Sequence, residues 1–170
     1  YVERQSGLCE LALHNFPLLG LGHIRIHNRD GVSYLQEMLP VDCLFLDPAR
    51  RDGHGGKTVA ISDCEPDVTV LEPLLVDKAK KVMVKLSPML DMSLALNELK
   101  TVRSVHIVAV NNECKELLLI LQKESVSSEV SIHCEHIVGN GESRHYTFTL
   151  KREKTSPCLL ACLLYTSPSP

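Results

Sequence analysis

Short apolar runs alternate with segments of helical periodicity, and this alternation predicts a sheet covered by helices. Residues 41–46 (VDCLFL), 81–86 and 104–110 are rich in apolar side chains, as strands buried on both faces are. Apolar positions between residues 6 and 19 follow helical spacing, and Pro17 and Gly20 are expected to end that helix. Residues 23–27 alternate in the manner of a further strand.

Capping residues and apolar spacing predict the remaining elements. Further helices are expected at residues 31–38, in the segment from Ser62 to Leu75, and at 92–99 and 113–121. Residues 129–138 and 145–150 are expected to pair as antiparallel strands around a turn at 139–141.

This order of elements predicts an α/β protein with a Rossmann-like, doubly wound and mostly parallel sheet, with antiparallel strands at the C-terminal end. Residues 1–150 are expected to form part of one domain whose first strand–helix unit lies upstream, and residues 151–161 a linker. Residues 162–170 (CLLYTSPSP) match one reading frame of a common transposase sequencing adapter. We therefore expect them to be foreign to the natural protein.

Composition excludes several classes of protein. The net charge of −3 provides no global basic field, so nucleic-acid binding would need a local patch or a separate domain. No run of about 18 apolar residues is present, so we expect no membrane-spanning helix. The seven cysteines are scattered and form no CxxC pair, which favours a reducing cytoplasm over a disulfide framework.

The richest chemistry follows the apolar run at residues 41–46. There the chain continues with Asp47, Pro48, Ala49, Arg50 and Arg51. Ligands of open α/β sheets bind outside the carboxyl ends of the strands, so a site is expected here. Asp47 is suited to orient or deprotonate a substrate, and the two guanidinium groups are suited to hold phosphate.

A lysine near the end of another predicted strand points to the same site. Lys85 must either extend to solvent or pair with an acid, and Asp47 and Asp63 are its candidate partners. An anionic substrate is the other candidate. Asp63 itself has helix capping as an equally adequate explanation.

Two other motifs do not predict sites. The sequence Gly56-Lys57-Thr58 resembles the end of a phosphate-binding loop, but Arg51 stands where that motif requires glycine. The cluster of residues 133–136 (HCEH) contains metal-ligand types, but alternation along a strand places successive side chains on opposite faces. We therefore expect a strand there and no metal site.

Four blocks in order resemble a bacterial family of class I S-adenosylmethionine-dependent methyltransferases with a THUMP-like C-terminal domain. They are residues 47–52 (DPARRD), 61–66 (ISDCEP), 85–91 (KLSPMLD) and 111–117 (NNECKEL). The resemblance covers about residues 1–161. It implies a methyltransferase that uses S-adenosylmethionine and acts on RNA through a domain beyond this chain.

The resemblance also implies roles for individual residues. Glu3 would bind the ribose hydroxyls of the cofactor, and Asp30 would face its adenine beside Gly31. Asp47, Pro48 and Arg50 would line the pocket in which the methyl group meets its acceptor. The glycine-rich first motif of the family would lie upstream of Tyr1, so we expect this chain alone to bind the cofactor poorly.

The sequence departs from two better-defined groups of methyltransferases. Arg50 replaces the aromatic residue of enzymes that methylate exocyclic amines, and Ser87-Pro88 stands where uracil-C5 enzymes carry a cysteine. The acceptor atom and the oligomeric state are left open. Two alternatives also stay open: another Rossmann-like enzyme such as a nucleotide-dependent oxidoreductase, and a non-enzymatic module that binds RNA or protein.

Overall fold

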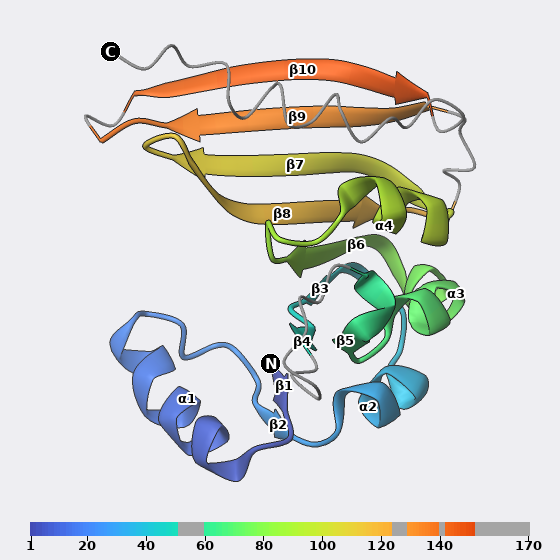
Figure 1. The fold of residues 1–170 in the computed structure, drawn as a ribbon. Helices are drawn as coiled ribbons and strands as arrows, with labels where there is room; N and C mark the ends of the chain where they lie inside the picture. Colours follow the sequence, from blue (N-terminus) through green and yellow to red (C-terminus); the bar gives the residue numbers. More distant parts are fainter. Residues whose placement is uncertain (51–59, 124–128, 140–141, 152–170) are drawn as a thin grey trace. The chain divides into compact units, whose positions relative to one another are not determined.

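The computed structural model describes residues 1–50, 60–123, 129–139 and 142–151. It divides into two compact units, Tyr1–Pro40 and Val41–Pro170, which are described separately (Figure 1). The predicted linker at 151–161 and the adapter-like residues 162–170 lie, apart from Lys151, outside the described residues. In the described part of the chain, no helix combines the length and the apolar character needed to cross a membrane.

The first unit is a short parallel strand pair with two helices. Its elements are β1 (Val2–Glu3), α1 (Ser6–Leu18), β2 (His27–Asn28) and α2 (Gly31–Glu37). The predicted helix at 6–19 is confirmed, and it ends just before Gly20, whose φ of 76° suits glycine. Pro17, which was also expected to end it, lies inside the helix. The strand predicted at 23–27 is wrong in extent, since only its last residue is extended and paired.

The second unit is built on a six-stranded sheet in the order β10-β9-β7-β8-β6-β3. The β3–β6 and β7–β9 pairs are parallel and the other three pairs are antiparallel. Four of these strands therefore run in one direction, and β8 and β10 run in the other. This arrangement confirms the predicted α/β class with antiparallel strands toward the C-terminal end. Its strands are β3 (Val41–Leu46), β6 (Ala79–Leu86), β7 (Val102–Val110), β8 (Glu113–Leu121), β9 (Glu129–Ile137) and β10 (Ser143–Lys151).

Smaller elements complete the second unit around this sheet (Figure 1). They are β4 (Ala49–Arg50), the 3₁₀ helix η1 (Ile61–Asp63), β5 (Cys64–Glu65), α3 (Val68–Lys78) and α4 (Met92–Glu98). The Asp91 side chain caps α4, which confirms the helix predicted at 92–99. The predicted helix start at Ser62 is wrong, because Asp67 caps α3 by accepting the Thr69 N–H at 2.9 Å.

The core of the second unit lies on one face of the sheet. A row of fully buried side chains crosses four neighbouring strands through Val84, Leu119, Val105 and Ile132. Burial of each such side chain contributes about 1.5–3 kcal/mol. This apolar row fixes the register, because a shift of one residue would turn every strand's apolar set outward.

The helix predicted at residues 113–121 is wrong, because this segment forms strand β8. Asn111 and Asn112 have φ values of 49° and 64°, the left-handed pair that a two-residue hairpin turn requires. The Asn112 N–H donates to Nε2 of His136 at 3.0 Å, which ties the turn to β9. The run of leucines that follows is compatible with a helix or a buried strand, and the turn decides between them.

We expect Asn112→Ala to lower the free energy of unfolding by about 1–2 kcal/mol, because alanine is strained at positive φ. Asn112→Gly should retain the wild-type stability or exceed it, since glycine adopts this backbone without strain. Urea denaturation followed by circular dichroism would measure both variants. Equal losses in the two variants would contradict the hairpin turn.

Candidate functional site

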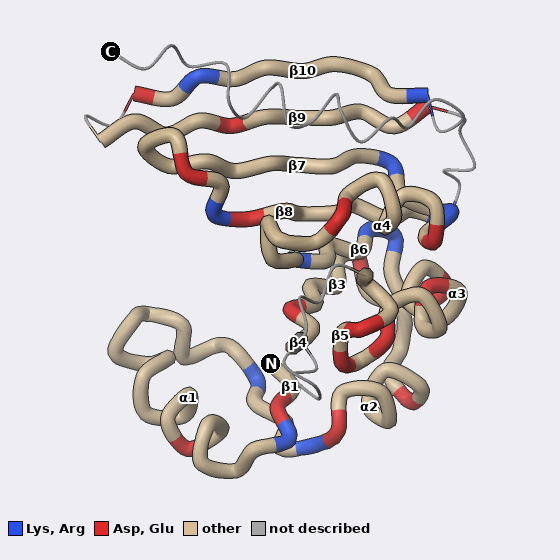
Figure 2. Tube along the Cα trace, in the orientation of Figure 1, with Lys and Arg blue, Asp and Glu red and all other residues tan. Residues whose placement is uncertain are grey.

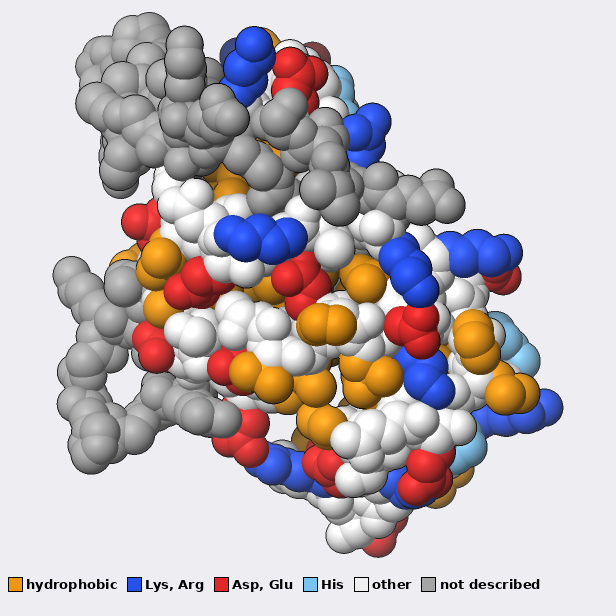
Figure 3. All heavy atoms as spheres, turned by 90° about the vertical axis from the view of Figure 1, so that its right-hand side faces the viewer, with side chains coloured by type: hydrophobic (Ala, Val, Ile, Leu, Met, Phe, Trp, Pro, Cys, Tyr) orange, Lys and Arg blue, Asp and Glu red, His pale blue; other side chains and the backbone are white. Residues whose placement is uncertain are grey.

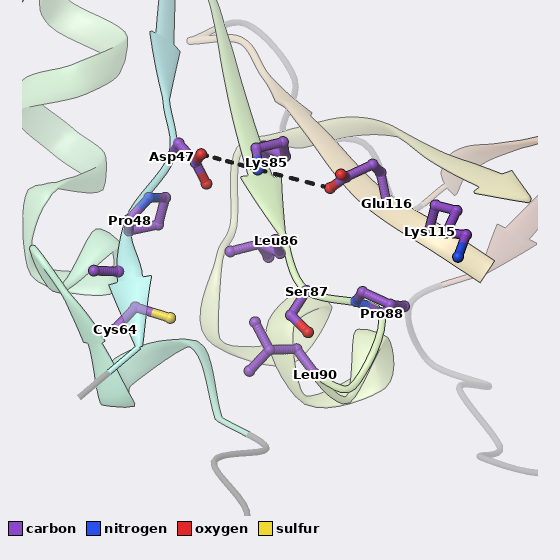
Figure 4. Close-up of a pocket in the computed structure, with 11 residues that line it drawn as sticks. Asp47, Pro48, Cys64, Lys85, Leu86, Ser87, Pro88, Leu90, Lys115 and Glu116 are labelled. Carbon is purple, nitrogen blue, oxygen red and sulfur yellow. Dashed lines mark ion pairs between the residues drawn. The ribbon is translucent and has the colours of Figure 1, made fainter. Parts of the chain in front are cut away.

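A cavity of about 330 Å³ lies in the second unit, at the carboxyl ends of β3 and β6. Figure 4 shows side chains from β5, β6, β8 and the segments that follow β3 and β6 around it. The sequence predicted a site at this edge of the sheet. Its polar and proline lining includes Asp47, Pro48, Lys85, Ser87, Pro88 and Glu116.

Lys85 lies between two carboxylates at this cavity. Its Nζ is 2.9 Å from Oδ2 of Asp47 and 3.8 Å from Oε2 of Glu116 (Figure 4). The predicted pairing of Lys85 with Asp47 is thus confirmed. The hydrogen bond with Asp47 raises the pKa of Lys85 against the opposing effect of burial, so the ammonium group stays charged.

The sheet register brings these three groups together. Parallel pairing places Leu46 opposite Val84, so the residues that follow, Asp47 and Lys85, meet where β3 ends. Antiparallel pairing places Leu118 opposite Lys85. Glu116 lies two residues before Leu118 and therefore on the same face of β8. The site therefore depends on β8 being a strand.

Apolar side chains form the remaining lining of the cavity. Pro48 is buried, and Cys64, Leu86 and Leu90 are between 1% and 6% exposed. Ligand pockets commonly combine such an apolar wall with a few placed polar groups and measure about 300–1,000 Å³. The Asp47 side chain is 56% exposed, so its carboxylate is accessible to a ligand.

Of the lining residues, sequence reasoning predicted only Asp47, Pro48 and Lys85 as part of the site, and Glu116 and Cys64 are two of those that it missed. Glu116 was assigned to a helix, and the Asn111-Asn112 turn is the signal that would have placed it on a strand beside Lys85. Cys64 was read as part of a helix cap, but it lies in β5, which pairs with β4 next to the site.

Other predicted site residues of the second unit lie apart from this lining or cannot be placed. Asp63 ends η1 and is absent from the residues that line the cavity. Burial raises the pKa of Glu98, and the charges of Asp67 and Asp63 add to this effect. The backbone of Arg50 pairs with Cys64 in the β4–β5 ladder. Arg51 lies outside the described residues.

The first unit brings Glu3 and Asp30 to one edge of its strand pair. Glu3 ends β1 and Asp30 follows β2, and the two strands are parallel. Oε1 of Glu3 accepts the Gln5 N–H at 2.8 Å. Figure 2 shows acidic and basic segments next to each other at this edge.

Asp30 caps α2 directly ahead of Gly31. Its Oδ1 accepts the backbone N–H of Ser33 at 2.8 Å and the Ser33 hydroxyl at 2.9 Å. These hydrogen bonds lower the pKa of Asp30, so its carboxylate is ionised at neutral pH. Gly31 begins the helix, and a Cβ there would meet no atom within 4 Å.

Charge is mixed over the molecular surface. On the face drawn in Figure 3, acidic and basic side chains are interspersed over the described residues. This agrees with the small net charge of −3.

Comparisons with known proteins identify a similar structure. A "putative methyltransferase" from Porphyromonas gingivalis W83 matches over 90% of this chain with 31% sequence identity and a TM-score of 0.69. The chain spans 38% of that protein. A modification subunit of a "putative type I restriction enzyme" from Vibrio vulnificus YJ016 matches over 94% of this chain, with 14% sequence identity and a TM-score of 0.47. This match covers 39% of the Vibrio protein.

No protein-family model matches the chain, and no curated protein matches it significantly. The similarity to the Porphyromonas protein extends over both units, because it covers nine tenths of the chain. The chain therefore has an α/β, Rossmann-like fold of the methyltransferase type.

Proposed function

We propose that this chain supplies the central and C-terminal part of a class I S-adenosylmethionine-dependent methyltransferase that acts on RNA. The main support is the charged site of Asp47, Lys85 and Glu116, at the strand ends of a fold shared with the Porphyromonas protein. Ligands of open α/β sheets bind at this edge. The RNA substrate rests on the resemblance to the family with a THUMP-like domain.

The cofactor half of the proposal rests on Glu3, Asp30 and Gly31. Carboxylates that follow parallel strands fit the hydroxyl donors of a ribose, as they do in dinucleotide-binding folds. Both carboxyl groups come from the same edge of the β1–β2 pair. When bound, S-adenosylmethionine would supply an electrophilic methyl group on a sulfonium.

Asp47 is the group that we propose to act on the acceptor. Its exposed carboxylate would accept a hydrogen bond from the acceptor and take its proton where one is lost. Lys85 would hold this carboxylate in place, because its charged ammonium group lies 2.9 Å away. Pro48 would restrict the backbone beside it through its fixed φ.

Substrate phosphate is the ligand that we propose for Arg50 and Arg51. Guanidinium groups bind phosphate oxygens with two parallel hydrogen bonds. Alignment of acceptor and methyl group would then supply much of the rate acceleration.

Transfer of tritium from methyl-labelled S-adenosylmethionine tests the proposed substrate. The full-length protein that contains this chain would be incubated with total bacterial RNA and, separately, with bacterial protein. We expect label in the RNA fraction and its loss after ribonuclease treatment. Label found only in protein would refute RNA as the substrate but would still show methyltransferase activity. Absence of label from both RNA and protein would refute the whole proposal.

A further inference from the structure

Three histidines from three neighbouring strands lie close together on one face of the sheet. His106 of β7 lies opposite His133 of β9, and their ring centroids are 4.5 Å apart with a 12° angle between the planes. The ring of His145 in β10 lies 5.8 Å from that of His133. We call these three residues the histidine ladder. None of the three lines the cavity at the carboxyl ends of β3 and β6.

Hydrogen bonds connect the ladder across the outermost strand pair. The Thr147 hydroxyl of β10 lies 3.2 Å from Nδ1 of His133 and 2.7 Å from Nε2 of His145. Nδ1 of His145 contacts the Glu135 carboxylate of β9. In the described sheet β10 is an edge strand that pairs with β9 alone, so these side chains add to the contacts that hold it.

The surroundings of the ladder disfavour additional protons. Glu135 faces it from β9 and already contacts His145. Burial lowers the pKa of His106, and the charge of His133 adds to this effect while Glu135 opposes it. Strand alternation places Lys81 and Lys85 of β6 and Glu116 of β8 on the same face, where Lys85 pairs with Asp47 at 2.9 Å and with Glu116 at 3.8 Å. Glu129 of β9 and Lys151 of β10 lie opposite each other on this face, at the far end of the outer strand pair. The residue directly between Lys85 and His106 is Leu118, which is uncharged.

We infer that the histidine ladder is a pH-sensitive latch, which holds β10 against β9 at neutral pH and loosens it when protons add charge to the stacked rings of His106 and His133. The Glu135 carboxylate can compensate the charge of one imidazolium, that of His145, which it contacts. Further protons would place like charges on the stacked rings of His106 and His133, which disfavours the charged forms.

The direction of the pH effect follows from the depressed pKa of His106. Above about pH 6.5, the ordinary pKa of histidine, the His106 ring is neutral in the folded and the unfolded chain, and the ladder contributes its full stability. As the pH falls below about 6.5, the unfolded chain binds more protons than the folded chain does. The stability of this part of the sheet therefore declines.

Amide hydrogen exchange of the chain between pH 7.5 and 5.0 tests the latch. After correction for the intrinsic pH dependence of exchange, we expect the protection of β10 amides to fall several-fold as the pH is lowered. The amides of β6 serve as an internal reference and should keep their protection. Parallel loss of protection in β6 and β10 would indicate global acid unfolding and would overturn the inference.

Variants distinguish the ladder from other titrating groups. His133→Gln removes the central ring, so β10 protection should become nearly independent of pH, and His106→Gln serves as a second variant if the first does not fold. The exposed His14 of the first unit provides the control, and His14→Gln should leave the wild-type pH dependence. The inference is wrong if wild-type β10 protection is constant over this range, or if it falls equally in both ladder variants.

Discussion

Replacement of Asp47 by asparagine is expected to slow methyl transfer by about 10²- to 10⁴-fold in the full-length protein. The substitution keeps the shape of the side chain and removes the charge that Lys85 pairs with and that the acceptor would meet. Single-turnover transfer of labelled methyl groups would measure the loss. A change confined to KM would instead indicate a role in substrate binding alone.

Asp42 provides a matched control at the other end of the same strand. It pairs with Lys80 of β6 at 2.7 Å, as Asp47 pairs with Lys85, but it is 87% exposed and lies outside the cavity lining. Asp42→Asn should transfer methyl groups at the wild-type rate. The assigned role of Asp47 would be wrong if its variant retained full activity, or if both variants lost activity equally.

Leu119→Ala is expected to lower the free energy of unfolding by about 2–5 kcal/mol. Leu119 is fully buried in β8 between Val84 of β6 and Val105 of β7, which are also fully buried. The truncation would leave a void that close-packed neighbours fill only in part. Urea denaturation would measure the change, and Leu119→Met would keep the volume if the alanine variant fails to fold.

A variant of the neighbouring Leu118 tests whether the loss of stability depends on which face of β8 a side chain occupies. Leu118 is half-buried on the opposite face of the sheet, so Leu118→Ala should cost about half as much or less. Equal losses from the two alanine variants would contradict the strand and its registration between β6 and β7.

The location of the site was predictable because it depends on local patterns. The apolar run of β3 ends at Asp47, and the strand rich in apolar residues ends just after Lys85, so both side chains were expected at the carboxyl edge. A half-buried lysine also needs a partner, which indicated an acid of a neighbouring strand. The Asp47–Lys85 ion pair follows from these two local facts and the parallel pairing.

Glu116 was not predictable in the same way, because its position depends on strand order. Residues 113–121 carry lysine and glutamate ahead of a leucine run, which suits a helix or a buried strand. Tertiary pairing with β6 and β7 selects the strand. The two asparagines ahead of it tolerate positive φ and were the one local signal for a hairpin.

The histidine ladder shows the same dependence on pairing. Alternation along the sequence places His133 and Glu135 on one face of a strand. In the structure both side chains contact side chains of β10, which confirms that they share a face of β9. His106 lies 27 residues earlier, and only the parallel β7–β9 register brings its ring over that of His133. Long-range register of this kind is set by the buried apolar face rather than by the polar residues themselves.

Calorimetric titration of the full-length protein with S-adenosylmethionine tests the proposed function most directly, because it needs no knowledge of the acceptor. We predict saturable heat with one cofactor per chain, and affinity about 10-fold weaker in Glu3→Gln, which loses a charged hydrogen-bond acceptor. Absence of heat in the wild-type protein would contradict the account and favour a module that binds RNA or protein without methyl transfer.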